Sequence, residues 1–289
     1  MLNRIAVMLQ YILPKQAITL LAGKFADAEA GWITTTVIRW FVGRYGVNMS
    51  EAAEADIERY STFNQFFTRA LRTDARPLAG TDFICPVDGA ISQLGNIENG
   101  QIFQAKGHKY STTALLGGNE KLAEKFANGS FATLYLSPKD YHRIHMPCAG
   151  RLKSMIHIPG SLFSVNPLTA QEVPGLFARN ERVVCEFESE ETGSFVMVLV
   201  GATIVGSMAT SWHGVVNPPR PKQARGWKYD QTTIELGQGD EMGRFLLGST
   251  VILLFPQHSL QFSTLWHAGK TVRMGEAMAV KPAQIRKPA

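Results

Sequence analysis

The feature that most restricts the fold of this chain is a change of sequence pattern near residue 82. Before it, the chain has a helical pattern; after it, short apolar runs rich in β-branched and aromatic residues alternate with Gly, Pro, Asn and Asp. We place predicted strands at 129–136, 182–187, 195–204, 231–236 and 249–255. The sequence therefore predicts an α+β chain, with a helical N-terminal arm over residues 1–70 and a β-rich body over residues 71–289.

The predicted arm contains three apolar runs, at 2–13, 18–22 and 32–42. None reaches the roughly 18 uninterrupted apolar residues of a membrane-spanning helix. Residues 1–44 hold five Lys or Arg and two Asp or Glu, and short basic amphipathic helices suit a membrane interface. The alternative is a set of helices that pack on their own core.

Two local patterns refine the arm. Ser50 followed by acidic residues predicts the start of a helix. Phe63, Phe66 and Phe67 follow at helical spacing, and we expect them to be packing residues rather than a binding cluster.

Charge and cysteine content restrict the partners and the compartment. The net charge of +5 indicates an anionic partner, and the basic residues are scattered without a nucleic-acid motif, so we expect a membrane surface and no nucleic acid. The three cysteines, Cys85, Cys148 and Cys185, include no C-x-x-C pair. This pattern indicates a reducing compartment with neither a disulfide framework nor a zinc site.

Three segments could carry chemistry. At Gly248-Ser249 the serine hydroxyl can attack the preceding glycine carbonyl and convert an amide into an ester, although Gly-Ser-Thr is also ordinary turn chemistry. A second segment, 85–89, contains Asp88, and a third, 136–147, contains His142 and His145. Asp, His and Ser are the groups needed to activate a hydroxyl, because the imidazole takes the proton and the carboxylate fixes its tautomer.

Each of these residues has a simpler interpretation. Asp88 precedes a glycine and fits a tight turn. His142 and His145 fit hydrogen-bonded core histidines or zinc ligands, but no third ligand has matching spacing, so we expect no metal. Cys148 lies close to them in sequence and fits buried packing better than a reactive thiol.

Six motifs in order make a specific pattern, which covers residues 60–255. They are 62–69 with Arg76-Pro77, 86–89, 106–111, 140–147, 159–166 and 241–250. In these motifs the chain resembles the bacterial phosphatidylserine decarboxylases of the pyruvoyl-dependent, membrane-associated type.

The resemblance implies a self-processing enzyme. It assigns a processing triad to Asp88, His145 and Ser249, with cleavage between Gly248 and Ser249 into a large subunit, 1–248, and a small subunit, 249–289. Ser249 becomes a covalent pyruvoyl cofactor, which decarboxylates phosphatidylserine to phosphatidylethanolamine through a Schiff base. His142 assists decarboxylation or protonation.

The resemblance also implies the setting. The substrate is phosphatidylserine in an anionic membrane, and the two subunits form a heterodimer at the cytoplasmic face of the cell membrane as a peripheral protein, with a higher oligomer left open. Two other functions stay open from the residues. One is a serine hydrolase that uses Asp88, His145 and Ser249, although the chain lacks a G-x-S-x-G elbow. The other is a lipid-binding module without catalysis.

Overall fold

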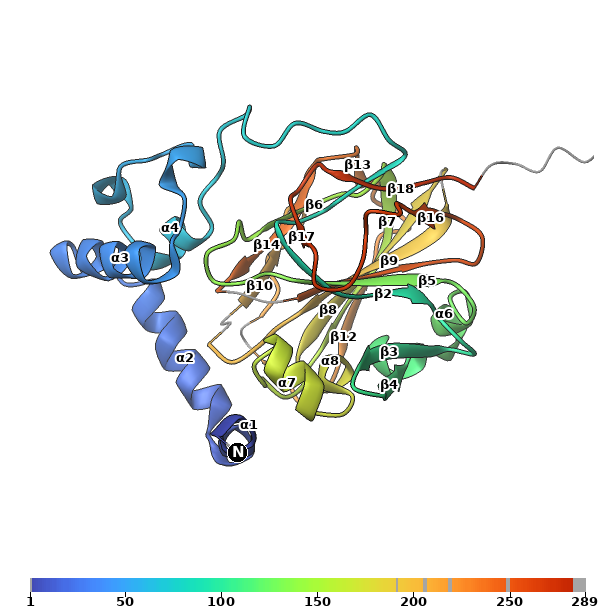
Figure 1. The fold of residues 1–289 in the computed structure, drawn as a ribbon, viewed down its shortest axis with the longest axis horizontal. Coiled ribbons are helices and arrows are strands. Elements are labelled where there is room, and N and C mark those ends of the chain that lie inside the picture. The colour runs from blue at the N-terminus through green and yellow to red at the C-terminus, as the bar shows by residue number, and fades with distance from the viewer. Residues whose placement is uncertain (1, 191, 205–206, 218–219, 248–249, 283–289) are drawn as a thin grey trace, which may run out of the picture.

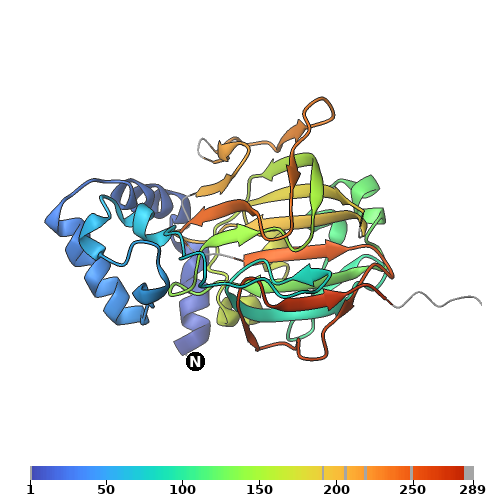
Figure 2. The same ribbon diagram turned by 90° about the horizontal axis from the view of Figure 1, so that it is seen from above.

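The computed structural model describes residues 2–190, 192–204, 207–217, 220–247 and 250–282. Its helices and strands confirm the predicted α+β class. The first part of the chain is helical and lies to one side of a β-rich body, as both views show (Figures 1 and 2). Its elements are α1 (Leu2–Ile12), α2 (Lys15–Ala26), α3 (Trp32–Tyr45), the 3-10 turns η1 (Met49–Glu51) and η2 (Ile57–Arg59), and α4 (Phe63–Phe67).

The three phenylalanines of α4 are packing residues, as predicted. Phe63, Phe66 and Phe67 are buried in one cluster with Ile38 of α3. The short helix begins at Thr62, whose hydroxyl accepts a hydrogen bond from the backbone N–H of Gln65. Aromatic burial of this kind holds α3 against α4.

The helix predicted to start at Ser50 is wrong. Asn48, not Ser50, caps a single 3-10 turn, Met49–Glu51, and the chain is extended at Ala52. An isolated bridge pairs Ala52 with Leu71, and Ala53 N–H donates to the carbonyl of Ala70. The backbone groups that a helix needs are therefore bonded to a neighbouring segment, which overrides the local helical preference.

The body is built around an antiparallel sheet of nine strands within the described residues. Its order is β12-β7-β8-β9-β15-β5-β2-β17, with β13 paired to β7. These strands are β2 (Gly89–Asn96), β5 (Ser130–Tyr135), β7 (Gly150–Ile158), β8 (Arg182–Ser189), β9 (Gly193–Val200), β12 (Arg225–Lys228), β13 (Glu235–Leu236), β15 (Thr250–Phe255) and β17 (Thr271–Val272).

Smaller elements cover this sheet. A four-stranded sheet has the order β11-β10-β14-β6, a three-stranded sheet the order β1-β18-β16, and β3 pairs with β4. The strands are β1 (Phe83–Ile84), β3 (Gln101–Ala105), β4 (His108–Ser111), β6 (Arg143–His145), β10 (Ser207–Thr210), β11 (Gly214–Val215), β14 (Glu241–Leu246), β16 (Gln261–Phe262) and β18 (Ala277–Val280). The helices are α5 (Thr112–Leu115), α6 (Glu120–Glu124), α7 (Pro167–Glu172) and α8 (Leu176–Arg179).

Strand β15 runs through the middle of the core, hydrogen-bonded to β5 on one side and β9 on the other. Successive side chains of a strand point to opposite faces. Val251, Leu253 and Phe255 lie in one buried cluster with Phe245 of β14, whereas the alternate residues lie in a second cluster with Phe177 of α8. Burial of both faces explains why this strand is an uninterrupted apolar run.

The predicted strands are confirmed in four of five places. The segments 129–136, 182–187, 195–204 and 249–255 overlap β5, β8, β9 and β15, although β9 ends at Val200 and residues 201–204 are not strand. In the fifth, 231–236, only Glu235–Leu236 forms a strand, and it pairs with the edge of β7. Side chains in that stretch are mostly exposed, so little burial supports a longer strand.

Candidate active site

The predicted cleavage bond joins two different sheets. Strand β14 ends at Leu246 in the four-stranded sheet, and β15 begins at Thr250 in the nine-stranded sheet. The chain therefore crosses from one sheet to the other within residues 247–249. Gly248 and Ser249 themselves lie outside the described residues, so the geometry of the bond is bounded by its two neighbours.

The residues on either side of the predicted cleavage bond, Leu247 and Thr250, are both buried, and each has a feature that is rare in a protein core. Leu247 has φ +93°, a conformation that costs a residue with a Cβ atom energy and that collects at functional sites. Its side chain packs into the cluster of α3 and α4. Thr250 is fully buried, and its hydroxyl has no hydrogen-bond partner among the described residues. Strain on one side and an unsatisfied hydroxyl on the other mark this crossover as a candidate reaction site.

His145 lies on β6, the neighbour of β14, where both ring nitrogens are hydrogen-bonded. Nδ1 is 2.7 Å from the carbonyl oxygen of Gly239, and Nε2 is 3.0 Å from the hydroxyl of Tyr141. A carbonyl only accepts, so Nδ1 carries the proton and Nε2 accepts from the tyrosine. Burial lowers the pKa of His145, against the opposing effect of Gly239. The ring is thus a neutral imidazole with its lone pair on Nε2.

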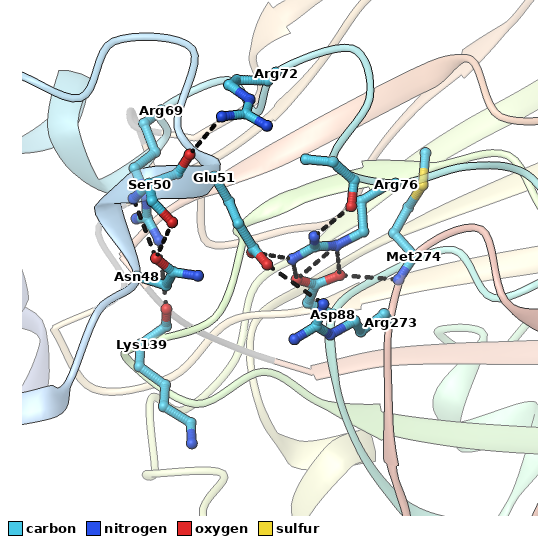
Figure 3. Close-up of polar contacts among 11 residues, drawn as sticks. Asn48, Ser50, Glu51, Arg69, Arg72, Arg76, Asp88, Lys139, Arg273 and Met274 are labelled. Carbon is cyan, nitrogen blue, oxygen red and sulfur yellow. Dashed lines mark hydrogen bonds and ion pairs between the residues drawn. The ribbon is translucent and has the colours of Figure 1, made fainter.

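Asp88 occupies the turn between β1 and β2 and is held by an ion pair. Its Oδ1 accepts hydrogen bonds of 2.9 Å from Arg76 Nε and from the backbone N–H of Met274 (Figure 3). Arg76 also donates to Glu51 at 2.8 Å. Gly89 follows because a Cβ atom there would lie 2.3 Å from the carbonyl oxygen of Tyr135.

Asp88 and His145, two members of the expected triad and both among the described residues, lie near each other but are not hydrogen-bonded to each other. The backbone N–H of His145 donates to the carbonyl of Pro86, two residues before Asp88, at 2.9 Å. Asp88 and Tyr141 line the same cavity of about 210 Å³. Within the described part of the chain, however, no hydrogen bond links Asp88 to His145, whose tautomer is fixed by Gly239 instead.

His142 comes three residues before His145 in the sequence, and its ring packs against an apolar side chain. Its ring is fully buried and stacks on Phe67, with centroids 4.0 Å apart and planes at 21°. Neither ring nitrogen makes a geometrically well-formed hydrogen bond among the described residues, although the backbone carbonyls of Ser137 and Pro138 lie close enough to raise the pKa of the ring. Burial, together with the charge of Arg69, lowers the pKa of His142 to about 3. Its carbonyl accepts from Phe245 N–H at 3.0 Å, which places it beside the end of β14.

An apolar cavity of about 220 Å³ adjoins the crossover. Leu247 and Phe67 line it, and so do Tyr45 from the end of α3 and Ser164 and Asn166 from the motif 159–166. The helical arm and three of the sequence motifs thus meet at one cavity beside the predicted cleavage bond. A small apolar site with a few polar groups is typical of ligand binding.

Sequence reasoning missed three partners of the predicted residues. Arg76 and Tyr141 stand in the quoted motifs, but no spacing rule assigns a guanidinium to Asp88 or a phenol to His145. Gly239 acts through its backbone carbonyl, which carries no side-chain signal. Among the described residues, no group of three His, Cys, Asp or Glu side chains could hold a metal ion, and no disulfide joins the cysteines.

Comparisons with known proteins agree on one family. A family model described as phosphatidylserine decarboxylase matches residues 63–280, and a second, described as PSD, matches residues 5–46. A protein of Dechloromonas aromatica (strain RCB), named phosphatidylserine decarboxylase proenzyme, is 67% identical over 278 residues, covering 96% of this chain and 98% of that protein. A protein of the same name from Herminiimonas arsenicoxydans is 64% identical over 289 residues, covering 100% of this chain and 98% of that one.

Proposed function

The chain belongs to the phosphatidylserine decarboxylase family, and from this premise we propose how its residues mature and act. The chain is a lyase that removes the carboxylate of phosphatidylserine as CO2, and it is made as a proenzyme. The single observation that carries the residue assignment is the strained backbone of Leu247 at the crossover between β14 and β15, with His145 on the adjoining strand β6 and His142 directly before that strand.

Maturation begins at Ser249. The neutral Nε2 of His145 takes the proton of the serine hydroxyl, whose oxygen attacks the Gly248 carbonyl and displaces the amide nitrogen to give an ester. Loss of the Gly248 carboxylate by β-elimination cuts the chain, and water then replaces the nitrogen, which leaves as ammonia. For Nε2 to act, the hydroxyl of Tyr141 must release it, since the two are hydrogen-bonded. Attack at this bond also relieves the left-handed backbone of Leu247.

Asp88 supports this step through the field of its charge and not through a direct bond. Its carboxylate raises the pKa of His145 electrostatically, but less than burial lowers it. The ion pair with Arg76 holds the carboxylate in a fixed position beside the site.

The residues around the crossover fit a pyruvoyl group at position 249. The neighbouring Thr250 hydroxyl is buried without a partner, and the apolar cavity is open to Leu247. When formed, this group supplies a ketone that accepts the substrate amine and takes up the electron pair of the breaking bond.

His142 is the proton donor of the proposed decarboxylation. Its nitrogens form no defined hydrogen bond among the described residues, although the backbone carbonyls of Ser137 and Pro138 act on the ring. The ring stacks on Phe67 and is kept neutral by burial, so it carries a single N–H proton. It can give this proton to the substrate Cα as its other nitrogen takes up a proton from a donor, which leaves the ring neutral. Phe67, which stacks on this ring, also lines the apolar cavity, and apolar surroundings favour loss of a charged carboxylate.

The helical arm serves as a peripheral membrane anchor. Twelve of the eighteen exposed large apolar side chains in the described chain lie between residues 8 and 45, among them Ile12, Leu21 and Trp32. An exposed apolar surface of this kind marks an interaction site, and basic residues of the arm favour anionic lipid. No described helix has the length and apolar character to cross a bilayer.

The anchor is also bonded to the loops that line the apolar cavity. The side chain of Gln10 accepts from the backbone N–H of Ser164 at 2.9 Å, and Thr19 accepts from the N–H of Ile204 at 3.1 Å. Ile204 has φ +73°, a rare conformation for a β-branched residue. The arm therefore holds strained active-site loops in place while it contacts lipid.

Two experiments test this function. Purified protein is assayed for conversion of phosphatidylserine to phosphatidylethanolamine, and its intact mass is measured before and after trapping with an amine and cyanoborohydride. We expect two fragments, 1–248 and 249–289, with the added mass on the smaller one. Ser249→Ala should remain one inactive chain; two fragments in that variant would rule out Ser249.

The anchor is tested with matched surface variants. Trp32 and Trp40 are 77% and 61% exposed on the arm, and Leu265 is 68% exposed on the body. The double variant Trp32→Ser/Trp40→Ser should sediment less with anionic vesicles, while Leu265→Ser should bind like the parent protein. Equal loss in both proteins would argue against a membrane role specific to the arm.

A further inference from the structure

Arg69 is a buried cation without a counter-ion. Its side chain is 5% exposed and lies over the ring of Phe66, with the guanidinium carbon 5.3 Å from the ring centre. Its Nε has no hydrogen-bond partner, and Nη2 makes only a long bond of 3.4 Å to the carbonyl of Lys139. No described carboxylate forms an ion pair with it. Buried charges are normally paired, so this one calls for an explanation.

Arg76 shows what a satisfied guanidinium looks like in the same cavity. It forms ion pairs with Asp88 and Glu51, at 2.5 and 2.8 Å, and Arg273 completes the neutral set with a contact of 3.3 Å to Glu51 (Figure 3). Arg69 stands outside this set in Figure 3, next to Asn48 and the Lys139 carbonyl. The difference between the two arginines is therefore the missing anion at Arg69.

The remaining charges around Arg69 leave the cavity positive. Beyond the neutral set, the lining includes Arg69, Lys139 and Asp140. Asp140 accepts its hydrogen bonds from Ser137, and burial raises its pKa. The carboxyl group of Asp140 thus faces two cations, Arg69 and Lys139, and burial makes it a weaker acid than an exposed aspartate. An anion that enters the cavity meets a net positive site.

The position of the cavity relates it to the reaction. It encloses about 210 Å³, enough for a small polar group and not for acyl chains. Tyr141, the hydrogen-bond partner of His145, lines it, and the charge of Arg69 acts on His142. Its rim includes Gly46 and Asn48 at the end of α3, the last helix of the proposed anchor. The cavity thus lies between the proposed lipid-facing helices and the two histidines.

We propose that Arg69 binds the phosphodiester of the lipid head group in this cavity, an inference that rests on the proposed function. The phosphodiester keeps its charge throughout the reaction, so binding it favours substrate and transition state alike. A guanidinium on the substrate carboxylate would instead stabilise the group that must leave as CO2 and would oppose decarboxylation. The fork of donors on Arg69 suits two phosphate oxygens.

The test uses mature protein and a soluble probe, glycerophosphoethanolamine, which carries the phosphodiester without acyl chains or a carboxylate. Binding is measured by titration calorimetry, independently of activity. Arg69→Gln should weaken probe binding at least 10-fold. Arg72→Gln is the matched control, because Arg72 is exposed, lies three residues away and pairs with Asp74; it should bind like the parent. Arg69→Lys, which keeps the charge but not the fork, should be intermediate.

Kinetics provide the second measurement. With short-chain phosphatidylserine, Arg69→Gln should raise KM at least 10-fold while kcat changes less than 3-fold. A loss confined to kcat, or probe binding equal to that of the parent in both Arg69 variants, would overturn the proposal. If Arg69→Gln does not mature, Arg69→Lys carries the test: probe binding at least 3-fold weaker than that of the parent, with a higher KM and kcat changed less than 3-fold, supports the proposal, and parent-like probe binding overturns it.

Two further outcomes separate the possible failures. L-serine has a carboxylate and no phosphate. If Arg69→Gln weakens the binding of L-serine but not the binding of the probe, the phosphodiester assignment is wrong. If the parent protein binds the probe through Arg69 but does not decarboxylate phosphatidylserine, the anion site stands and the proposed function fails.

Discussion

His145 and His142 are three residues apart, yet their surroundings have little in common. The ring of His145 is hydrogen-bonded at both nitrogens, by Gly239 and Tyr141, and Tyr141 lines a polar cavity. The ring of His142 has no hydrogen bond among the described residues and is stacked on Phe67. A ring whose tautomer is fixed by hydrogen bonds suits a general base. A ring whose nitrogens make no such bonds suits a group that forms hydrogen bonds only with the bound substrate. The contrast supports different tasks for the two histidines.

The largest effect is expected from His145→Ala, which removes the proposed base of maturation. We expect cleavage to slow by at least 100-fold, in line with the usual contribution of a general base. The measurement is the fraction of uncut chain in an intact-mass spectrum over time. His267→Ala serves as control, because His267 is exposed. Normal cleavage without His145 would remove the distinction drawn between the two histidines.

Next in size is His142→Phe, which keeps a flat ring against Phe67 and removes both nitrogens. This variant should mature at the normal rate but decarboxylate roughly 100-fold more slowly, because the proton donor is missing. Cleavage is followed by mass and CO2 release by a coupled assay. If the variant stays uncut while His145→Ala matures, the two roles are exchanged.

A smaller effect concerns stability and pH. His142 has a folded pKa of about 3 against an ordinary value near 6.5, so the folded protein binds fewer protons than the unfolded chain between these values. The stabilisation is fully present above pH 6.5 and is lost as the pH falls toward 3, at about 1.4 kcal/mol per unit.

This pH dependence distinguishes the parent from His142→Phe. Chemical denaturation at pH 6.5 and 5 should show a steeper loss for the parent, by about 2 kcal/mol. The comparison is made on the Ser249→Ala background, so that every sample is one chain. Parallel loss in the two proteins would mean that His142 does not titrate as a buried neutral ring.

The smallest effect is expected from Tyr141→Phe. Loss of the hydroxyl frees Nε2 of His145 from the hydrogen bond it must otherwise give up, and it also removes one of the two contacts that orient the ring. The ring keeps its tautomer through Gly239, and we expect the loss of orientation to be the larger effect. Maturation should slow about 3- to 10-fold, the size of one hydrogen bond. Decarboxylation by the matured fraction should be unchanged. A decarboxylation defect of the same size would mean that Tyr141 acts in decarboxylation, together with His142, and not only in maturation.

Much of the architecture was predictable because it depends on burial. Strands β5, β8, β9 and β15 are apolar runs whose two faces are both covered, and such runs are recognisable from composition alone. The helix predicted at Ser50 failed because its backbone bonds to a segment near Ala70, and no local pattern reports such a contact.

The candidate site was predictable only in part. Asp88, His142 and His145 have side chains that can take part in acid–base chemistry, and the family resemblance assigns a role to each of them. Their partners were not, because Arg76 reaches Asp88 across 12 positions and Gly239 reaches His145 across 94. Contacts of this kind depend on how the strands are arranged. The ion pair of Asp88 with Arg76 accordingly went unpredicted, although both residues stand in recognisable motifs.

The place of β15 has a consequence for the life of the molecule. Its main chain is paired with β5 over Thr250–Phe255 and with β9 over Thr250–Leu254, directly after the proposed reactive position. Under the proposed maturation, a catalytic group made there would never be taken up from solution or exchanged, so activity would be independent of any vitamin supply. The same permanence is a liability. A single reductive or trapping event at that carbonyl disables the polypeptide for good, and only new synthesis can replace it.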